Sequence, residues 1–181
     1  MLPQPQTILQ FWFTELTPKD HFAKNAALDE TIRSRFGATL EAAARCELFA
    51  WRATPEGRLA EVLVLDQFSR NVYRDAARAF AQDALALAMA QELVASGHDR
   101  SLTLAQRSFA YMPYMHSESA LVHTQAVALF SQPGMEDTLR FELRHQDIIK
   151  RFGRYPHRNA VLGRTSTVEE LAFLSEPGSG F

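Results

Sequence analysis

The chain has 181 residues, the length of one domain with room for a sizeable core. Hydrophobic residues make up 46% of it and charged residues 22%, which excludes a disordered, collagen-like or disulfide-scaffold protein. The 19 Lys and Arg against 21 Asp and Glu give a formal net charge of −2, so no global attraction to nucleic acid or to an anionic membrane is expected.

Residue usage predicts an all-α protein. Ala and Leu together number 47, whereas Val and Ile number 12, a balance that favours helices over strands. Glycines and prolines leave helix-length intervals between them, and we expect about eight helices, at 5–14, 28–51 (either continuous or broken at Gly37), 56–68, 76–96, 101–111, 117–131, 136–152 and 167–175. These helices are expected to form one domain over residues 1–175, followed by a flexible C-terminal tail over 176–181.

Several helix ends carry recognisable signals. Thr54 followed by Pro55 is typical of a helix start, and Gly97 and Gly153 stand where helix C-terminal caps belong. The spacing Ser-x-x-Glu from residue 166 predicts a capping box at the start of the last helix. The Ala-rich stretch over 76–95 favours close packing of antiparallel helix pairs.

Opposite charges lie on the apolar stripe of the helix expected over 56–68. At about 100° per residue, Asp66 and Arg70 flank the position of Leu59. They are either a satisfied structural ion pair or the border of a polar pocket. Asn71 and Arg74 follow directly and add donors suited to phosphate or carboxylate recognition.

A second polar segment surrounds Pro113, which is expected to end one helix before Ser117 caps the next. That corner gathers Tyr111, His116 and Glu118. A lone His-x-Glu is a weak metal signature, and an acid in the first helical turn is explained by the helix dipole, so no metal site is predicted.

The third segment, residues 140–164, contains seven Lys or Arg and only two acids. His145 shares a helix face with Phe141 and Ile149 and is expected to point inward, as a satisfied core residue or as a proton-transfer or ligand group. After Gly153 the chain forms a rigid, donor-rich loop, either a binding loop or a solvated basic one, that carries the candidate ligand contacts Arg154, His157, Arg158, Asn159 and Arg164.

Targeting signals are not apparent in the sequence. The first residues lack the basic and apolar regions of a secretory leader, and no apolar run reaches the roughly 18 residues needed to span a bilayer. The single cysteine, Cys46, lies in an Ala- and Leu-rich run and is expected to be a buried thiol. We therefore expect a cytoplasmic protein that does not engage membranes.

The three polar segments together resemble a bacterial family, domain of unknown function 924. They read LDQFSRNVYR over 65–74, YMPYMHSE over 111–118 and HQDIIKRFGRYPHRNAVLGRTS over 145–166, and the resemblance covers nearly the whole chain. Ser69 replaces the proline of the usual LDQFPRN string, which affects only the rigidity of that turn. The resemblance implies an all-helical, TPR-like fold with a right-handed superhelical arrangement, and it implies no particular reaction.

Three functions are compatible with these residues. The first is a helical module whose polar pocket, assembled from the three segments, binds a small phosphate- or carboxylate-bearing ligand. The second is an enzyme using Asp66, His116, Glu118 or His145 for acid–base chemistry on an anionic substrate, without a cofactor. The third is a peptide- or protein-binding scaffold. Nucleic-acid binding is not expected from the charge balance, and the oligomeric state stays open.

Overall fold

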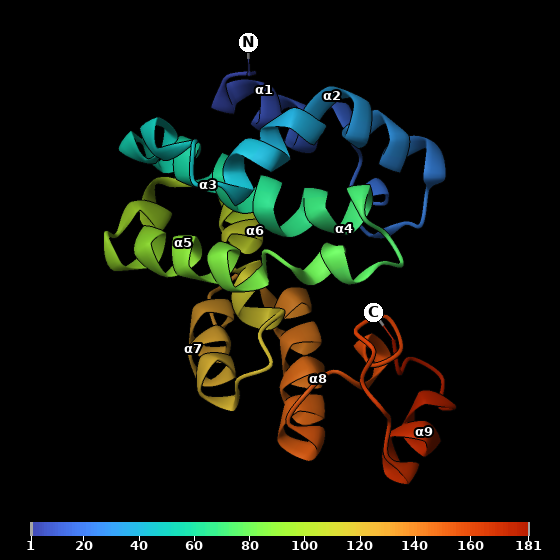
Figure 1. The fold of residues 1–181 in the computed structure, drawn as a ribbon. Helices are drawn as coiled ribbons and strands as arrows, with labels where there is room; N and C mark the ends of the chain where they lie inside the picture. The colour runs from blue at the N-terminus through green and yellow to red at the C-terminus, as the bar shows by residue number, and fades with distance from the viewer. Residues whose placement is uncertain (1, 181) are drawn as a thin grey trace. The chain divides into compact units, whose positions relative to one another are not determined.

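Residues 2–180 are described by a computed structural model (Figure 1). These residues form α-helices joined by short 3₁₀ and π segments and contain no β-strand, which confirms the all-α class. No helix among them has the length and apolar character needed to cross a membrane. The chain divides into two compact units, one made of the residues up to Arg74 with Arg78–Pro113, the other of Asp75–Ala77 with the residues from Tyr114 onward.

The first unit is built around an aromatic core. Its helices are α1 (Pro5–Gln10), α2 (Ala26–Ala44), α3 (Pro55–Leu63), α4 (Ser69–Val72), α5 (Asp83–Ala95) and most of α6 (Leu104–Met115). Two π segments, Phe11–Glu15 and Val64–Phe68, extend α1 and α3. The Phe11 ring lies 5.0 Å from the Phe36 ring and 6.0 Å from that of Phe68, and these rings are buried. This packing fixes the segment that carries Asp66.

The second unit contains α7 (Ala120–Phe130), α8 (Glu136–Phe152) and α9 (Val168–Leu174). α7 and α8 are joined by a short loop and lie side by side as an antiparallel pair, as expected (Figure 1). Ile148, Ile149 and Tyr155 form a small core, against which Phe152 and Phe173 pack. A TPR-like superhelical arrangement stays a prediction.

The remaining short helices are single turns of 3₁₀ geometry. They occupy Asp20–Phe22, Phe49–Ala53, Ala77–Phe80, His98–Ser101 and Pro156–Arg158. The last of these turns shapes the loop after α8, which is the loop that the sequence predicted to be rigid and rich in donors.

Three of the predicted helix ends are confirmed. The Thr54 hydroxyl accepts a 3.1 Å hydrogen bond from the Gly57 amide at the start of α3. Gly97 and Gly153 have φ of 70° and 71°, in the left-handed region where only glycine is unstrained, and they follow α5 and α8.

The chain does not break its helices at Gly37, where a break was one of two alternatives, or at Pro113, where a helix end was expected. α2 runs through Gly37 without interruption, because buried neighbours along the helix outweigh the cost of roughly 1 kcal/mol that a helical glycine carries. α6 includes Pro113 and continues to Met115, so proline does not end it. Tyr111, Tyr114 and Met115 are buried, and their packing offsets the lost backbone hydrogen bond.

The capping predictions near the second unit need correction. α7 has Ser119 as its N-cap, and the Ser117 hydroxyl accepts from the Ser119 amide instead of capping the helix itself. The capping box of α9 lies one residue later than predicted, between Thr167 and Glu170. That register turns Glu170 inward, where it meets an arginine.

The prediction of a buried thiol is wrong. α2 ends at Ala44, and Cys46 sits in the following turn with a left-handed φ of 58° and an exposed side chain. The turn aims the thiol away from the helical face that the composition of the run suggested.

Candidate functional site

The two opposite charges on the apolar stripe, Asp66 and Arg70, form an ion pair inside the first unit. Asp66 is 1% exposed, and its carboxylate lies 3.0 Å from the guanidinium of Arg70 and 2.6 Å from the amide nitrogen of Gln67. Arg70 also contacts the Asp83 carboxylate at 2.9 Å. This geometry is that of a satisfied structural ion pair and not of a pocket border, because Arg70 and Gln67 both contact the buried carboxylate of Asp66.

Asn71 and Arg74 converge on Asp29 of α2. The Asn71 amide donates to Asp29 at 2.8 Å, and the Arg74 guanidinium contacts the same carboxylate at 2.5 and 2.7 Å. Burial raises the pKa of Asp29, but these hydrogen bonds outweigh it and the pKa is lowered. Tyr111 likewise donates to the buried Asp99 at 2.6 Å. The predicted binding residues of this unit therefore contact carboxylates of their own unit.

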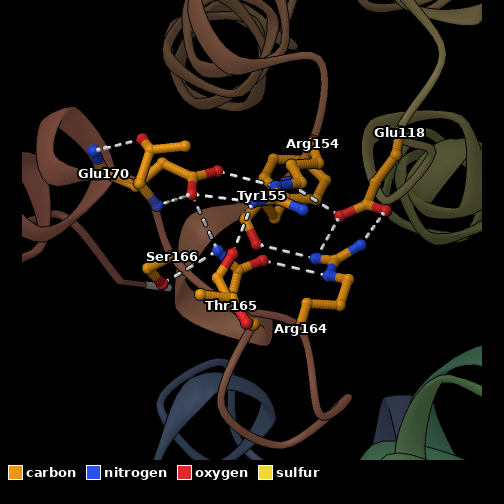
Figure 2. A network of polar contacts seen from close by, with 9 residues as sticks. Glu118, Arg154, Tyr155, Arg164, Thr165, Ser166 and Glu170 are labelled. Carbon is orange, nitrogen blue, oxygen red and sulfur yellow. Dashed lines mark hydrogen bonds and ion pairs between the residues drawn. The ribbon is translucent and has the colours of Figure 1, made fainter.

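A network of polar contacts in the second unit joins the loop after α8 to Glu118, which precedes α7, and to α9 (Figure 2). The Arg164 guanidinium contacts both oxygens of Glu118, at 2.7 and 2.9 Å, and the Tyr155 amide donates to Glu118 at 2.7 Å. Burial raises the pKa of Glu118, but the hydrogen bonds from Arg164 and Tyr155 outweigh it and the pKa is lowered. Glu118 is therefore held as a carboxylate, which makes it a weak base.

The other half of the network ties α9 to the loop (Figure 2). Arg154 contacts both oxygens of Glu170, at 2.7 and 2.8 Å, and this pairing lowers the pKa of Glu170 to about 2. Asn159 joins the halves, because its oxygen accepts from Arg164 at 2.9 Å while its nitrogen donates to Ser166 at 3.0 Å and to Glu170 at 3.2 Å. Each bidentate pair is thus held by further hydrogen bonds.

The remaining predicted residues of the loop pack against Tyr155. Arg158 is buried, lies 4.6 Å above the Tyr155 ring and donates to the His116 carbonyl at 3.1 Å. The His157 ring is 5.4 Å from the same tyrosine. The structure therefore brings together, within the second unit, His116, Glu118, Arg154, His157, Arg158, Asn159 and Arg164. A pocket assembled from all three segments stays a prediction.

His145 points inward, as predicted. It is 5% exposed, and its Nδ1 lies 2.7 Å from the Phe141 carbonyl. Burial, reinforced by the neighbouring histidines, lowers the pKa of His145 to about 3. The imidazole is consequently neutral at pH 7 and is a weak base.

Sequence reasoning missed a buried histidine–glutamate pair beside it. His123 Nδ1 lies 2.7 Å from Glu142 Oε1, and both side chains are fully buried. His123 Nε2 is 2.8 Å from the Ser117 carbonyl and 3.2 Å from the Tyr155 hydroxyl. Burial raises the pKa of Glu142. The available signal was the spacing of Glu142 and His145, three residues apart on the inward face of α8.

An open depression of about 370 Å³ lies between the end of α8 and the start of α9. It is lined by Arg151, Phe152, Arg154, Thr167, Glu169 and Glu170. The Arg151 guanidinium lies 4.6 Å from the Phe152 ring and 5.8 Å from the Phe173 ring. Within residues 2–180 it forms no ion pair, which sets it apart from Arg154 and Arg164. Arg151 belongs to the basic segment over 140–164 but is not among the ligand contacts predicted from the sequence.

Metal-binding geometry is not found in the part of the chain that the structure describes, since no three His, Cys, Asp or Glu side chains gather in a suitable group there. The side chains that line the depression offer guanidinium, aromatic, hydroxyl and carboxylate groups.

Comparison with known proteins agrees with the resemblance seen in the sequence. Residues 8–178 match the family described as bacterial protein of unknown function, DUF924. A solved structure of a protein of unknown function from Agrobacterium tumefaciens is similar, with 38% identity, a TM-score of 0.90 and coverage of 94% of this chain and 96% of that one. No curated protein matches the sequence. The chain belongs to the bacterial DUF924 family.

Proposed function

We propose that this protein is a helical binding protein that takes a carboxylate- or phosphate-bearing ligand in the depression at Arg151. The proposal is supported by the surroundings of the Arg151 guanidinium. Its guanidinium is stacked over aromatic rings, borders the 370 Å³ depression and forms no ion pair with any residue that the structure describes. A planar cation held in this way presents its N–H groups to a ligand with little ordering cost.

Two arginines of the loop after α8 are less suited to this role. Arg154 and Arg164 each contact both oxygens of a carboxylate from their own unit. A ligand that displaced Glu118 or Glu170 would leave a partly or fully buried carboxylate without its partner, which costs several kcal/mol. We therefore assign these arginines to holding the loop, with Arg154 also forming one edge of the depression.

Glu169 restricts which anion fits. It lines the same depression from α9, is exposed and forms no ion pair among the described residues. A compact double anion such as phosphate is repelled by this carboxylate, whereas a ligand that joins one carboxylate to an N–H donor satisfies both Arg151 and Glu169. The proposed ligand therefore carries an acid group and an amide or amine.

The acid–base alternative has less support. Asp66 and Glu118 are engaged with arginines, and the pKa of His145, lowered to about 3 by burial, leaves it neutral. A cytoplasmic location remains part of the proposal, since an exposed free thiol at Cys46 is best tolerated in a reducing compartment.

The proposal is tested by NMR titration of the ¹⁵N-labelled protein with N-acetylglutamate amide and, separately, with inorganic phosphate. We expect Arg151→Ala to weaken N-acetylglutamate amide binding about tenfold, because one charge-assisted contact is worth roughly 1.5 kcal/mol. Lys150→Ala is the matched control. It removes the same charge from the adjacent position of α8, where Lys150 bonds Gln146 and does not line the depression.

Glu169→Gln supplies a second test of opposite sign. Removing this carboxylate is expected to strengthen phosphate binding, while N-acetylglutamate amide gains less because its N–H groups then meet the uncharged, weaker acceptor oxygen of glutamine. If Arg151→Ala and Lys150→Ala weaken binding equally, the attraction is general to the basic helix and the proposed site is wrong.

A further inference from the structure

Helix α8 carries the dipeptide Arg-Phe twice, each time with an exposed arginine. Arg140–Phe141 lies in its second turn and Arg151–Phe152 in its last. The two pairs are eleven residues apart, which is within about 20° of three full helical turns at 100° per residue. They therefore lie on the same face, separated by about 16.5 Å along the helix axis.

Each Arg-Phe pair borders its own open depression. The first is lined by Arg140, Phe141 and Arg144 and measures about 230 Å³; the second is the 370 Å³ depression at Arg151. Phe141 is 51% exposed, although its helical position next to His145 predicted an inward side chain. An arginine beside an exposed aromatic ring is the composition typical of protein-recognition surfaces.

The Arg-Phe pair at residues 140 and 141 is accessible to a partner molecule. Arg140 contacts Asp137, but the two side chains are 76% and 84% exposed. An ion pair at that exposure contributes less than about 1 kcal/mol and is exchanged readily for a partner's carboxylate. Both guanidiniums, at Arg140 and at Arg151, can thus receive an acid from outside the chain.

From this juxtaposition, and resting on the function proposed above, we infer that α8 is the docking surface for an acidic peptide segment whose two carboxylates bind Arg140 and Arg151. A single small anion does not span about 16.5 Å, whereas an extended peptide covers that distance in about five residues. Acids four or six positions apart keep both side chains on the face of the peptide that meets the helix. An apolar side chain between them packs on Phe141, and peptide N–H groups satisfy Glu169.

Charge distribution favours a short acidic peptide over a long polyanion. Asp147 lies on α8 between the two Arg-Phe pairs, and Glu136 and Asp137 open the helix. These acids interrupt the basic face, so a continuous phosphate backbone meets repulsion there, whereas a peptide with two spaced acids does not.

The inference is tested by calorimetric titration with four peptides of nine residues, acetylated and amidated at their ends, with Leu at position 6, on the same face as positions 2 and 8. One has Glu at positions 2 and 8, two have a single Glu with Gln at the other position, and one has Glu at positions 2 and 4. We expect the 2,8-peptide to bind at least tenfold more tightly than the others, because its second contact is intramolecular. Arg140→Ala and Arg151→Ala should each reduce its affinity to that of a single-acid peptide, while Lys150→Ala should change it less than twofold.

The outcomes separate this inference from the proposed function. Equal affinities of the single-acid and 2,8-peptides, with loss of both in Arg151→Ala, overturn the two-point docking but keep the anion site. Loss of tight binding in Lys150→Ala as much as in the arginine variants, or tighter binding of heparin than of the 2,8-peptide, overturns the peptide as the partner. Absence of binding by every peptide overturns both proposals. Thermal melts of the three variants check that they fold, as expected for substitutions of exposed side chains.

Discussion

Acidification should destabilise the protein through His145. Its pKa is lowered from 6.5 to about 3, chiefly by burial, so the folded state binds fewer protons than the unfolded state between these values. Stability therefore rises with pH in this window and is lost as the pH falls below about 6.5. The linkage relation gives a loss of about 2 kcal/mol at pH 5 and roughly 4 kcal/mol by pH 3.

Urea unfolding at pH 7.5 and pH 5, followed by circular dichroism, measures this loss. His145→Leu and His145→Asn both remove the titrating group but differ in polarity, so their stabilities at pH 7.5 will differ. Both should nevertheless lose about 2 kcal/mol less than the wild type between the two pH values. If either variant keeps the full wild-type difference, the buried neutral imidazole is not the origin of the acid sensitivity.

Three further predictions concern the second unit. His123→Ala should lower the free energy of unfolding in urea by about 3–5 kcal/mol, because it leaves Glu142 buried without its partner. Glu142→Gln keeps a hydrogen bond to His123 and should lower it by only about 1 kcal/mol. Equal losses in the two variants would contradict the pairing. Glu170→Gln should weaken the pH dependence of the unfolding free energy between about pH 4.5 and 2. The lowered pKa of Glu170 gives the wild type stability that is lost as the pH falls through that range, and the variant lacks this contribution. An unchanged pH dependence would count against the ion pair. Thr167→Ala should lower the free energy of unfolding by about 1 kcal/mol, because it removes the N-cap of α9, and Ser166→Ala should lower it by less. The opposite order would show that the capping box begins at residue 166.

Local signals in the sequence predicted much of the fold. The Ala and Leu excess predicted the helices, and Thr54 and Gly153 marked ends that depend only on neighbouring backbone groups. Pro113 was misjudged because burial of its helix outweighed a local preference. The capping box was placed one residue early because its register depends on Glu170 reaching Arg154, a contact that local sequence does not specify.

The candidate site was less predictable because its contacts join distant parts of the chain. Arg164 meets Glu118 across 46 residues, and Arg74 meets Asp29 across 45. Sequence showed which arginines were present but not which already had carboxylate partners. Arg151 differs from Arg154 and Arg164 because it has no carboxylate partner among the described residues. Its one sequence signal is the recurrence of Arg-Phe eleven residues after Arg140.

The central claim, that Arg151 receives the ligand while Arg154 and Arg164 hold the loop, is tested most directly by following arginine side-chain Nε–H signals by NMR. N-acetylglutamate amide is titrated into the ¹⁵N-arginine-labelled protein, and the signals are assigned from the individual Arg→Lys variants. We predict that the Arg151 signal shifts and saturates while those of Arg154 and Arg164 stay within a small fraction of that shift. A saturable shift of the Arg154 or Arg164 signal with Arg151 unaffected would contradict the account.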